Sequence, residues 1–147
     1  MHQKVVLQFQ ARGETIPVDH GFLLYSALSR VAPALHNSRE AGVKLLRGKY
    51  RGQGELDISA GALLQILAPE AEIAELLQLA GAAIELAGTL ITLGPPRTLP
   101  LEPRPALYAH IVTTRNGHDE NAFTAEIARQ LDAMPVRCSW RLGKRRT

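Results

Sequence analysis

Apolar side chains change from strand spacing to helix spacing and back again through the first 94 residues. Val5, Leu7 and Phe9 alternate with other residues, which is typical of a half-buried strand. From Leu24 to Leu35 the apolar residues recur three or four positions apart, and this spacing predicts a helix with one buried face. Further strands are expected at 43–47, 55–58, 63–67 and 84–93, and a second helix from Pro69 to Gly81. This order predicts an α+β, ferredoxin-like βαββαβ domain, an arrangement that RNA-recognition modules share.

A proline-rich stretch separates this pattern from a second one. Five prolines between Gly94 and Pro105 predict a stiff, extended linker. Beyond it we expect a strand at 107–112, a helix carrying Phe123 and Ile127, and a strand at 136–142. The sequence therefore predicts a ferredoxin-like domain over 1–94, a linker over 95–105 and a partial second ferredoxin-like unit over 106–147. A β-α-β unit leaves a sheet edge unpaired, so we expect a homodimer or a partner chain to complete it.

Composition excludes several classes of protein. The 147 residues, 46% of them apolar, can form one sizeable core or two small ones. The apolar runs are short and broken by proline, glycine or charge, so no membrane span is expected. A single cysteine, Cys138, excludes an internal disulfide and a multi-cysteine zinc site. We expect a cytoplasmic protein without a metal or another cofactor.

The charges are unevenly distributed, although the net charge is only +3. Five cations and one acid lie between residues 39 and 51, whereas residues 55–94 carry acids only. This asymmetry indicates a side that faces a polyanion such as RNA, although charged runs can also be merely solvated. The candidate RNA-binding residues are Arg39, Lys44, Arg47, Lys49, Arg51, Arg141, Lys144, Arg145 and Arg146.

A histidine just past the first helix is the favoured catalytic candidate. Asp19 is expected to cap that helix, and Pro33 to bend or end it near its last turn. His36 then follows in a polar turn, where it can donate a proton to a leaving oxygen while Lys49 and its neighbours hold phosphate. The alternative is an ordinary surface histidine. Tyr25 lies eleven residues earlier, on the same face of an unbroken helix, and is either an assisting or a structural residue.

His20 is the rival to His36. It lies at the start of the helix, where the helix dipole opposes protonation, so it suits a base better than an acid. It is also well placed to form part of the capping turn, so both roles stay open.

Several segments in order resemble one protein family. They are VVLQFQARGETIPVDHGFLLYSALSRVAPALH, KLLRG, LLQLAGAAIELAGTLITLGPP, HIVT and GKRRT. Together they resemble the CRISPR-associated endoribonucleases of the Cas-six type, and most closely their small myxobacterial-type branch. The likeness extends from Lys4 to Thr147, but the glycine-rich loop after the last strand of the family's second domain is absent. We therefore expect a chain that lacks the family's C-terminal part.

The resemblance implies an activity. In this family the RNA 2′-hydroxyl attacks the adjacent phosphorus without a metal, giving a cyclic phosphate and a free 5′-hydroxyl. A histidine on or just after the first helix commonly transfers the proton, and His36 occupies that place. The implied function is processing of CRISPR repeat RNA into guide RNA, with other CRISPR effector subunits as further expected partners. Two alternatives stay open: a repeat-RNA-binding subunit that does not cut, and a ferredoxin-like protein-interaction domain.

Overall fold

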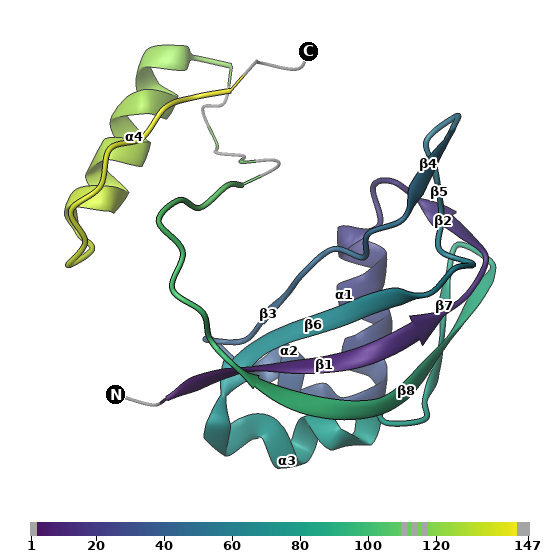
Figure 1. Ribbon diagram of the computed structural model, residues 1–147. Coiled ribbons are helices and arrows are strands. Elements are labelled where there is room, and N and C mark those ends of the chain that lie inside the picture. The colour runs from purple at the N-terminus through teal and green to yellow at the C-terminus, as the bar shows by residue number, and fades with distance from the viewer. Residues whose placement is uncertain (1–2, 110–111, 113–114, 116–117, 144–147) are drawn as a thin grey trace. The chain divides into compact units, whose positions relative to one another are not determined.

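The computed structural model describes residues 3–109, 112, 115 and 118–143. The chain forms two compact units, one over residues 1–103 and the other over residues 104–147 (Figure 1). The first unit contains β1 (Lys4–Arg12), β2 (Thr15–Pro17), α1 (Gly21–Val31), α2 (Pro33–Asn37), β3 (Gly42–Val43), β4 (Lys49–Gly52), β5 (Glu55–Asp57), β6 (Ala62–Pro69), the short helices η1 (Glu70–Glu72), α3 (Ile73–Leu76) and η2 (Leu77–Leu79), β7 (Ala83–Leu86) and β8 (Thr89–Pro100). In the second unit the one helix among the described residues is α4 (Glu120–Asp132).

The main sheet has the strand order β3-β6-β1-β8-β7, and all of its neighbouring strands are antiparallel. The elements β1, α1, β3, β6, α3 and β8 follow the βαββαβ order, with β1 in the middle of the sheet. The predicted α+β, ferredoxin-like fold is therefore confirmed for the first unit. A small sheet of order β2-β5-β4 is an addition to it.

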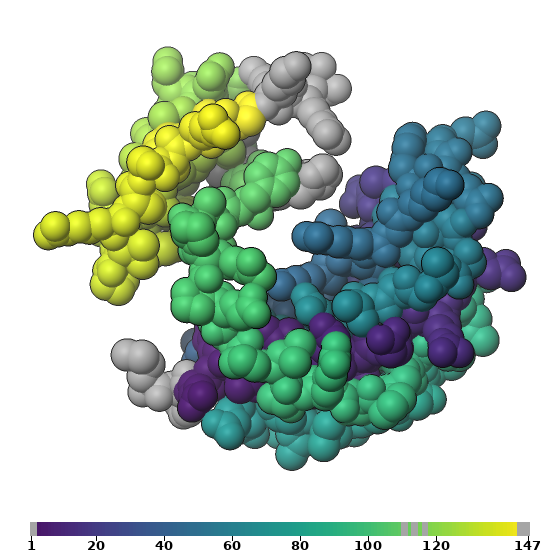
Figure 2. Space-filling model, viewed as in Figure 1, coloured from purple at the N-terminus to yellow at the C-terminus, as the bar shows by residue number. Residues whose placement is uncertain are grey.

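The core lies between the main sheet and the helices. Leu7 and Phe9 of β1 face Leu24 and Leu28 of α1 in one buried cluster, and Ile66 of β6 belongs to it as well. Side chains alternate along a strand, so the intervening residues of β1 lie on the other face of the sheet. In Figure 1 α1 and α2 lie behind the sheet, and its other face is turned toward the reader; Figure 2 shows the space-filling view from the same side.

The first helical segment is two helices rather than one bent helix. Ala32, with φ of −124°, ends α1, and Pro33 begins α2. Proline suits the first position of a helix because its missing N–H group would have no partner there. The residue preceding α1 is His20 and not Asp19, so the expected aspartate cap is wrong. The second predicted helix is also divided, into η1, α3 and η2.

The strand expected over 84–93 is a hairpin. Ala87 and Gly88 both have positive φ, 49° and 84°, and form the two-residue turn between β7 and β8. Such turns match the twist of the strands that they join.

β8 then continues to Pro100, so the first six residues of the linker predicted over 95–105 belong to the sheet instead. The reason is the edge of the sheet: β7 pairs only with Thr89–Thr92, so the rest of β8 has one open side. An edge strand tolerates prolines, because the missing N–H groups can face that side.

The second unit confirms its predicted helix but neither of its predicted strands, since residues 107–109 and 112, the described part of the strand predicted over 107–112, are not in a strand either. Asp119 caps α4, accepting hydrogen bonds from the N–H groups of Asn121 at 3.0 Å and Ala122 at 3.1 Å. Residues 136–142 form no strand, because no described segment pairs with them. Cys138 and Trp140 in this segment are both exposed. No helix in the described part of the chain is long and apolar enough to cross a membrane.

Candidate functional site

His36 lies in the last turn of α2 and is exposed to solvent. It was expected in the turn after the helix, but Pro33 begins a new helical segment that contains it. The following turn is ordered by Ser38, whose Oγ accepts hydrogen bonds from the N–H groups of Glu40 at 3.2 Å and Ala41 at 3.0 Å. Arg39 is exposed in that turn. His36 and Arg39 are thus both accessible to a ligand.

Tyr25 lies beside His36 even though the helix between them is broken. Their ring centroids are 6.5 Å apart, with the ring planes tilted by 47°. The Tyr25 hydroxyl donates a hydrogen bond to the main-chain carbonyl of Leu35 at 3.2 Å. α2 therefore folds back against α1, and this bond fixes the residue next to His36. The predicted proximity is confirmed, although it comes from packing between two helices.

His20, the rival candidate, is buried, with only 1% of its surface exposed. Its Nε2 accepts a hydrogen bond from the N–H of Leu46 at 2.9 Å, so that nitrogen carries no proton. Nδ1 donates to the carbonyl of Pro17 at 2.8 Å. Both ring nitrogens are occupied by main-chain partners, which favours the structural role of His20 over the catalytic one.

The predicted cations do not lie on one continuous strand. β3 ends at Val43 and β4 begins at Lys49, so Arg47 lies in the connecting segment 44–48. That segment turns inward at Leu46, which is 2% exposed. At Gly48 a Cβ atom would lie only 2.5 Å from the main-chain oxygen of Asp57, so only glycine allows this close approach. The strand predicted over 43–47 is therefore wrong beyond Val43.

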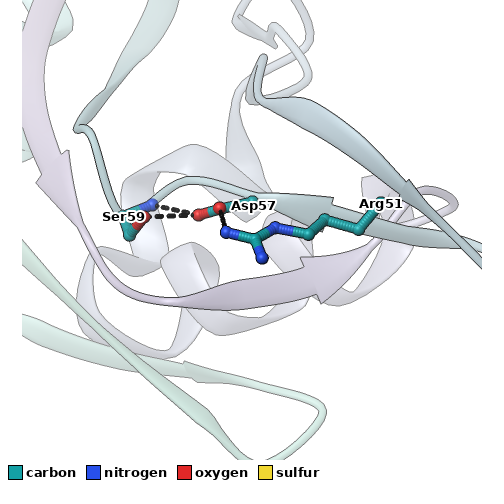
Figure 3. Close-up of polar contacts among 3 residues, drawn as sticks. All are labelled: Arg51, Asp57 and Ser59. Carbon is teal, nitrogen blue, oxygen red and sulfur yellow. Dashed lines mark hydrogen bonds and ion pairs between the residues drawn. The ribbon is translucent and has the colours of Figure 1, made fainter.

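Lys44 and Arg51 have polar partners within the protein, whereas the exposed Arg47 and Lys49 form no ion pair with any described residue. Lys44 Nζ donates to Gln65 Oε1 at 3.1 Å. Arg51 forms an ion pair with Asp57, as Figure 3 shows. The charge of Arg51 is thus already compensated, and Arg47 and Lys49 are better candidates for phosphate contacts.

Asp57 is held in its charged form by several donors (Figure 3). Its Oδ1 accepts hydrogen bonds from the Ser59 hydroxyl at 2.6 Å and the Ser59 N–H at 2.8 Å. These bonds, together with Arg51, hold the pKa of the Asp57 carboxyl well below its usual range.

We expect Asp57→Asn to destabilise the first unit at neutral pH, because the amide replaces a carboxylate that accepts from Ser59 and Arg51. Since folding lowers the pKa of Asp57, its stabilising effect is present above the ordinary value of 3.8 and is lost as the pH falls below it. Thermal unfolding followed by circular dichroism at a series of pH values would test this. The difference in melting temperature between wild type and variant should become smaller in acid. A difference that stayed the same at every pH would contradict the role assigned to Asp57.

The remaining candidates belong to the second unit. Arg141 is exposed in a segment without regular structure. Lys144, Arg145 and Arg146 lie outside the described residues. Among the described residues no three His, Cys, Asp or Glu side chains form a group that could hold a metal ion.

Comparison with known proteins adds one family and one relative. The family model described as "Cas6 Crispr" matches residues 5–147. A curated relative, the CRISPR-associated endonuclease Cas6 of Myxococcus xanthus (strain DK1622), is 40% identical over 142 residues. The match covers 97% of this chain and 61% of that protein, so the chain spans about three fifths of the length of its curated relative.

Proposed function

The chain belongs to the Cas6 family, and on this basis we propose that it takes part in cutting CRISPR repeat RNA as a metal-independent endoribonuclease. The family match over nearly the whole chain is the observation that carries the proposal. The exposed His36, held beside Tyr25, supports it because the proposed reaction needs an accessible group that transfers a proton.

In the proposed reaction the RNA supplies its own nucleophile. The 2′-hydroxyl gives its proton to solvent and attacks the adjacent phosphorus, while the bond from phosphorus to the 5′-oxygen breaks. A protonated His36 donates its proton to that leaving oxygen, so the products are a 2′,3′-cyclic phosphate and a 5′-hydroxyl. The hydroxyl hydrogen of Tyr25 is directed at the Leu35 carbonyl, so its oxygen lone pairs can accept a hydrogen bond from the 2′-hydroxyl. Lys49 and Arg47 are proposed to stabilise the charge that develops on the phosphorane.

Two measurements on the same mixture test this function. Filter binding with a repeat hairpin RNA shows whether the chain binds RNA at all, and no binding would favour a protein-interaction role instead. A denaturing gel run with a chelator present shows whether the bound RNA is cut. Binding without cleavage would favour the non-cleaving subunit. A homodimer and contacts with other CRISPR effector subunits stay predictions.

We expect the double variant Arg47→Ala, Lys49→Ala to bind repeat RNA more weakly and with a shallower dependence on salt. Each phosphate contact with single-stranded RNA contributes about 0.7 to the slope of log K against log salt. Loss of two contacts should therefore reduce the slope by about 1.4, measured by fluorescence anisotropy over a salt series. A matched control, Arg30→Ala with Arg137→Ala, removes the same charge from exposed positions that are not RNA-binding candidates. Equal slopes in the two double variants would place the RNA on another surface.

A further inference from the structure

Four polar side chains form a row across the helix-free face of the main sheet. Gln8 on β1 lies opposite Gln65 on β6 and opposite Arg97 on β8. Lys44 extends the row beyond β6, because its N–H donates to the main-chain oxygen of Gln65 at 3.0 Å. We call Lys44, Gln65, Gln8 and Arg97 the polar row. Because side chains alternate along β1 and Leu7 and Phe9 face the core, Gln8 and its cross-strand partners lie on the face away from the helices.

The polar row lacks one hydrogen-bond acceptor. Lys44 donates to Gln65 Oε1 at 3.1 Å, and Gln65 Nε2 donates to Gln8 Oε1 at 2.7 Å, which leaves the Gln8 nitrogen facing the Arg97 guanidinium. If the Gln8 amide is turned over, its oxygen accepts from Arg97 Nη2 at 2.8 Å and Nε at 2.9 Å, but its nitrogen then faces Gln65 Nε2 at 2.7 Å. Lysine and arginine only donate, and each amide has one donor and one acceptor end. Whatever the amide orientations, one of the three contacts in the row joins two donors.

Gln8 in the middle of the row is only 4% exposed, whereas Lys44 and Arg97 at its two ends are exposed and can turn a spare donor to solvent or to a ligand. The row also carries two positive charges, and no carboxylate of the described residues forms an ion pair with Lys44 or Arg97. The spare donor and the two positive charges make the row suited to an anion that supplies oxygen acceptors.

We propose that the polar row binds a phosphate of single-stranded RNA, with Arg97 and the Gln8 nitrogen as its donors. Arg97 is exposed and can turn toward the phosphate, which removes the donor–donor contact inside the row. The neighbouring row on the same face is apolar, with the half-buried Leu67 and Leu99 on either side of the buried Val6, and the two leucines can pack against bases and riboses. This combination of cations and apolar surface suits a single strand better than an acidic peptide. The inference rests on the proposed RNA-binding function and adds a contact separate from His36.

Three variants test the row. Arg97→Gln removes the phosphate donor from an exposed position and should weaken binding roughly tenfold or more, since charged hydrogen bonds are the strong ones. Gln8→Glu places a carboxylate between Gln65 and Arg97, so every contact in the row then has an acceptor. It should raise the melting temperature and at the same time weaken RNA binding, whereas a purely structural row would change only the stability. Arg30→Gln on α1 is the control for charge.

Binding is measured by anisotropy with a labelled, unstructured oligouridylate and with the oligodeoxythymidylate of the same length. The side-chain amide signals of Gln8 and Gln65 are followed by NMR during the same titrations. We expect both oligomers to shift these signals, and Arg97→Gln to reduce the salt slope by about 0.7. Unshifted amide signals, or an Arg97→Gln variant that binds like Arg30→Gln, would overturn the proposal.

The DNA oligomer separates this proposal from the proposed function. It has no 2′-hydroxyl and cannot be cut by the proposed reaction, yet it presents the same phosphates. If the chain binds both oligomers through the polar row but leaves repeat RNA intact, the proposed cleavage function is refuted and phosphate binding by the polar row is supported. If the variants of the polar row bind both oligomers and cut repeat RNA as the wild type does, the polar row is not an RNA site and the proposed cleavage function is unaffected. Stronger binding of an acidic peptide than of either oligomer would also overturn the row as an RNA site.

Discussion

His36→Ala should abolish cleavage of repeat RNA while leaving its binding nearly unchanged. The variant removes the proposed proton donor, and loss of a general acid typically slows a reaction by about 10²–10⁴-fold. Affinity should persist, because the phosphate contacts are assigned to other residues. A denaturing gel under single-turnover conditions gives the rate, and anisotropy gives the affinity.

Asn37→Ala is the matched control, since Asn37 is the next exposed residue of α2. It should cut at the wild-type rate and report any general disturbance of the helix. Tyr25→Phe keeps the ring beside His36 but removes the hydroxyl that donates to Leu35. Its rate should lie between those of the wild type and His36→Ala. Cleavage by His36→Ala at the wild-type rate would refute the assignment.

His20→Ala should have the largest effect on stability among the site variants. It leaves the Leu46 N–H and the Pro17 carbonyl without their partner in a buried place. Each orphaned group costs about 1–3 kcal/mol, so the free energy of unfolding should fall by about 2–6 kcal/mol. Urea denaturation followed by circular dichroism measures this loss.

His20→Gln separates a structural role from a catalytic one, because its amide oxygen can accept from Leu46 while it cannot transfer protons as imidazole does. We expect this variant to recover part of the stability and to retain cleavage. A stable His20→Gln protein that no longer cuts RNA would restore His20 as the catalytic base.

Much of the first unit could be predicted from sequence, because its burial pattern is regular. The alternation of Leu7 with its neighbours and the helical spacing from Leu24 to Leu35 correspond to real elements. The predictions were wrong where contacts with residues distant in the sequence decide the local structure. Proline in β8 is tolerated only because β7 is short, and the sequence around Pro96 does not contain that information.

The candidate site was only partly predictable for the same reason. The neighbourhood of Tyr25 and His36 was foreseen from their spacing. The ion pair of Arg51 with Asp57 depends on the pairing of β4 with β5, so the clustering of cations overstated how many are available to RNA. Arg97 was missed because it lies in a stretch interpreted as a linker. A polar residue alternating with core residues on a central strand, as Gln8 does, is the signal that could have indicated the polar row.

The connection between β3 and β4 has an entropic consequence for ligand binding. Lys44 is tied to β6 through its main chain, Leu46 to His20, and Gly48 lies against Asp57, so every second residue is held by the fold. The residues between them, among them Arg47, project from a backbone that is already ordered. Binding partners usually lose affinity when they must immobilise a loop, and a preorganised loop avoids that loss. The chain thus orders this segment when it folds, and RNA need not order it again.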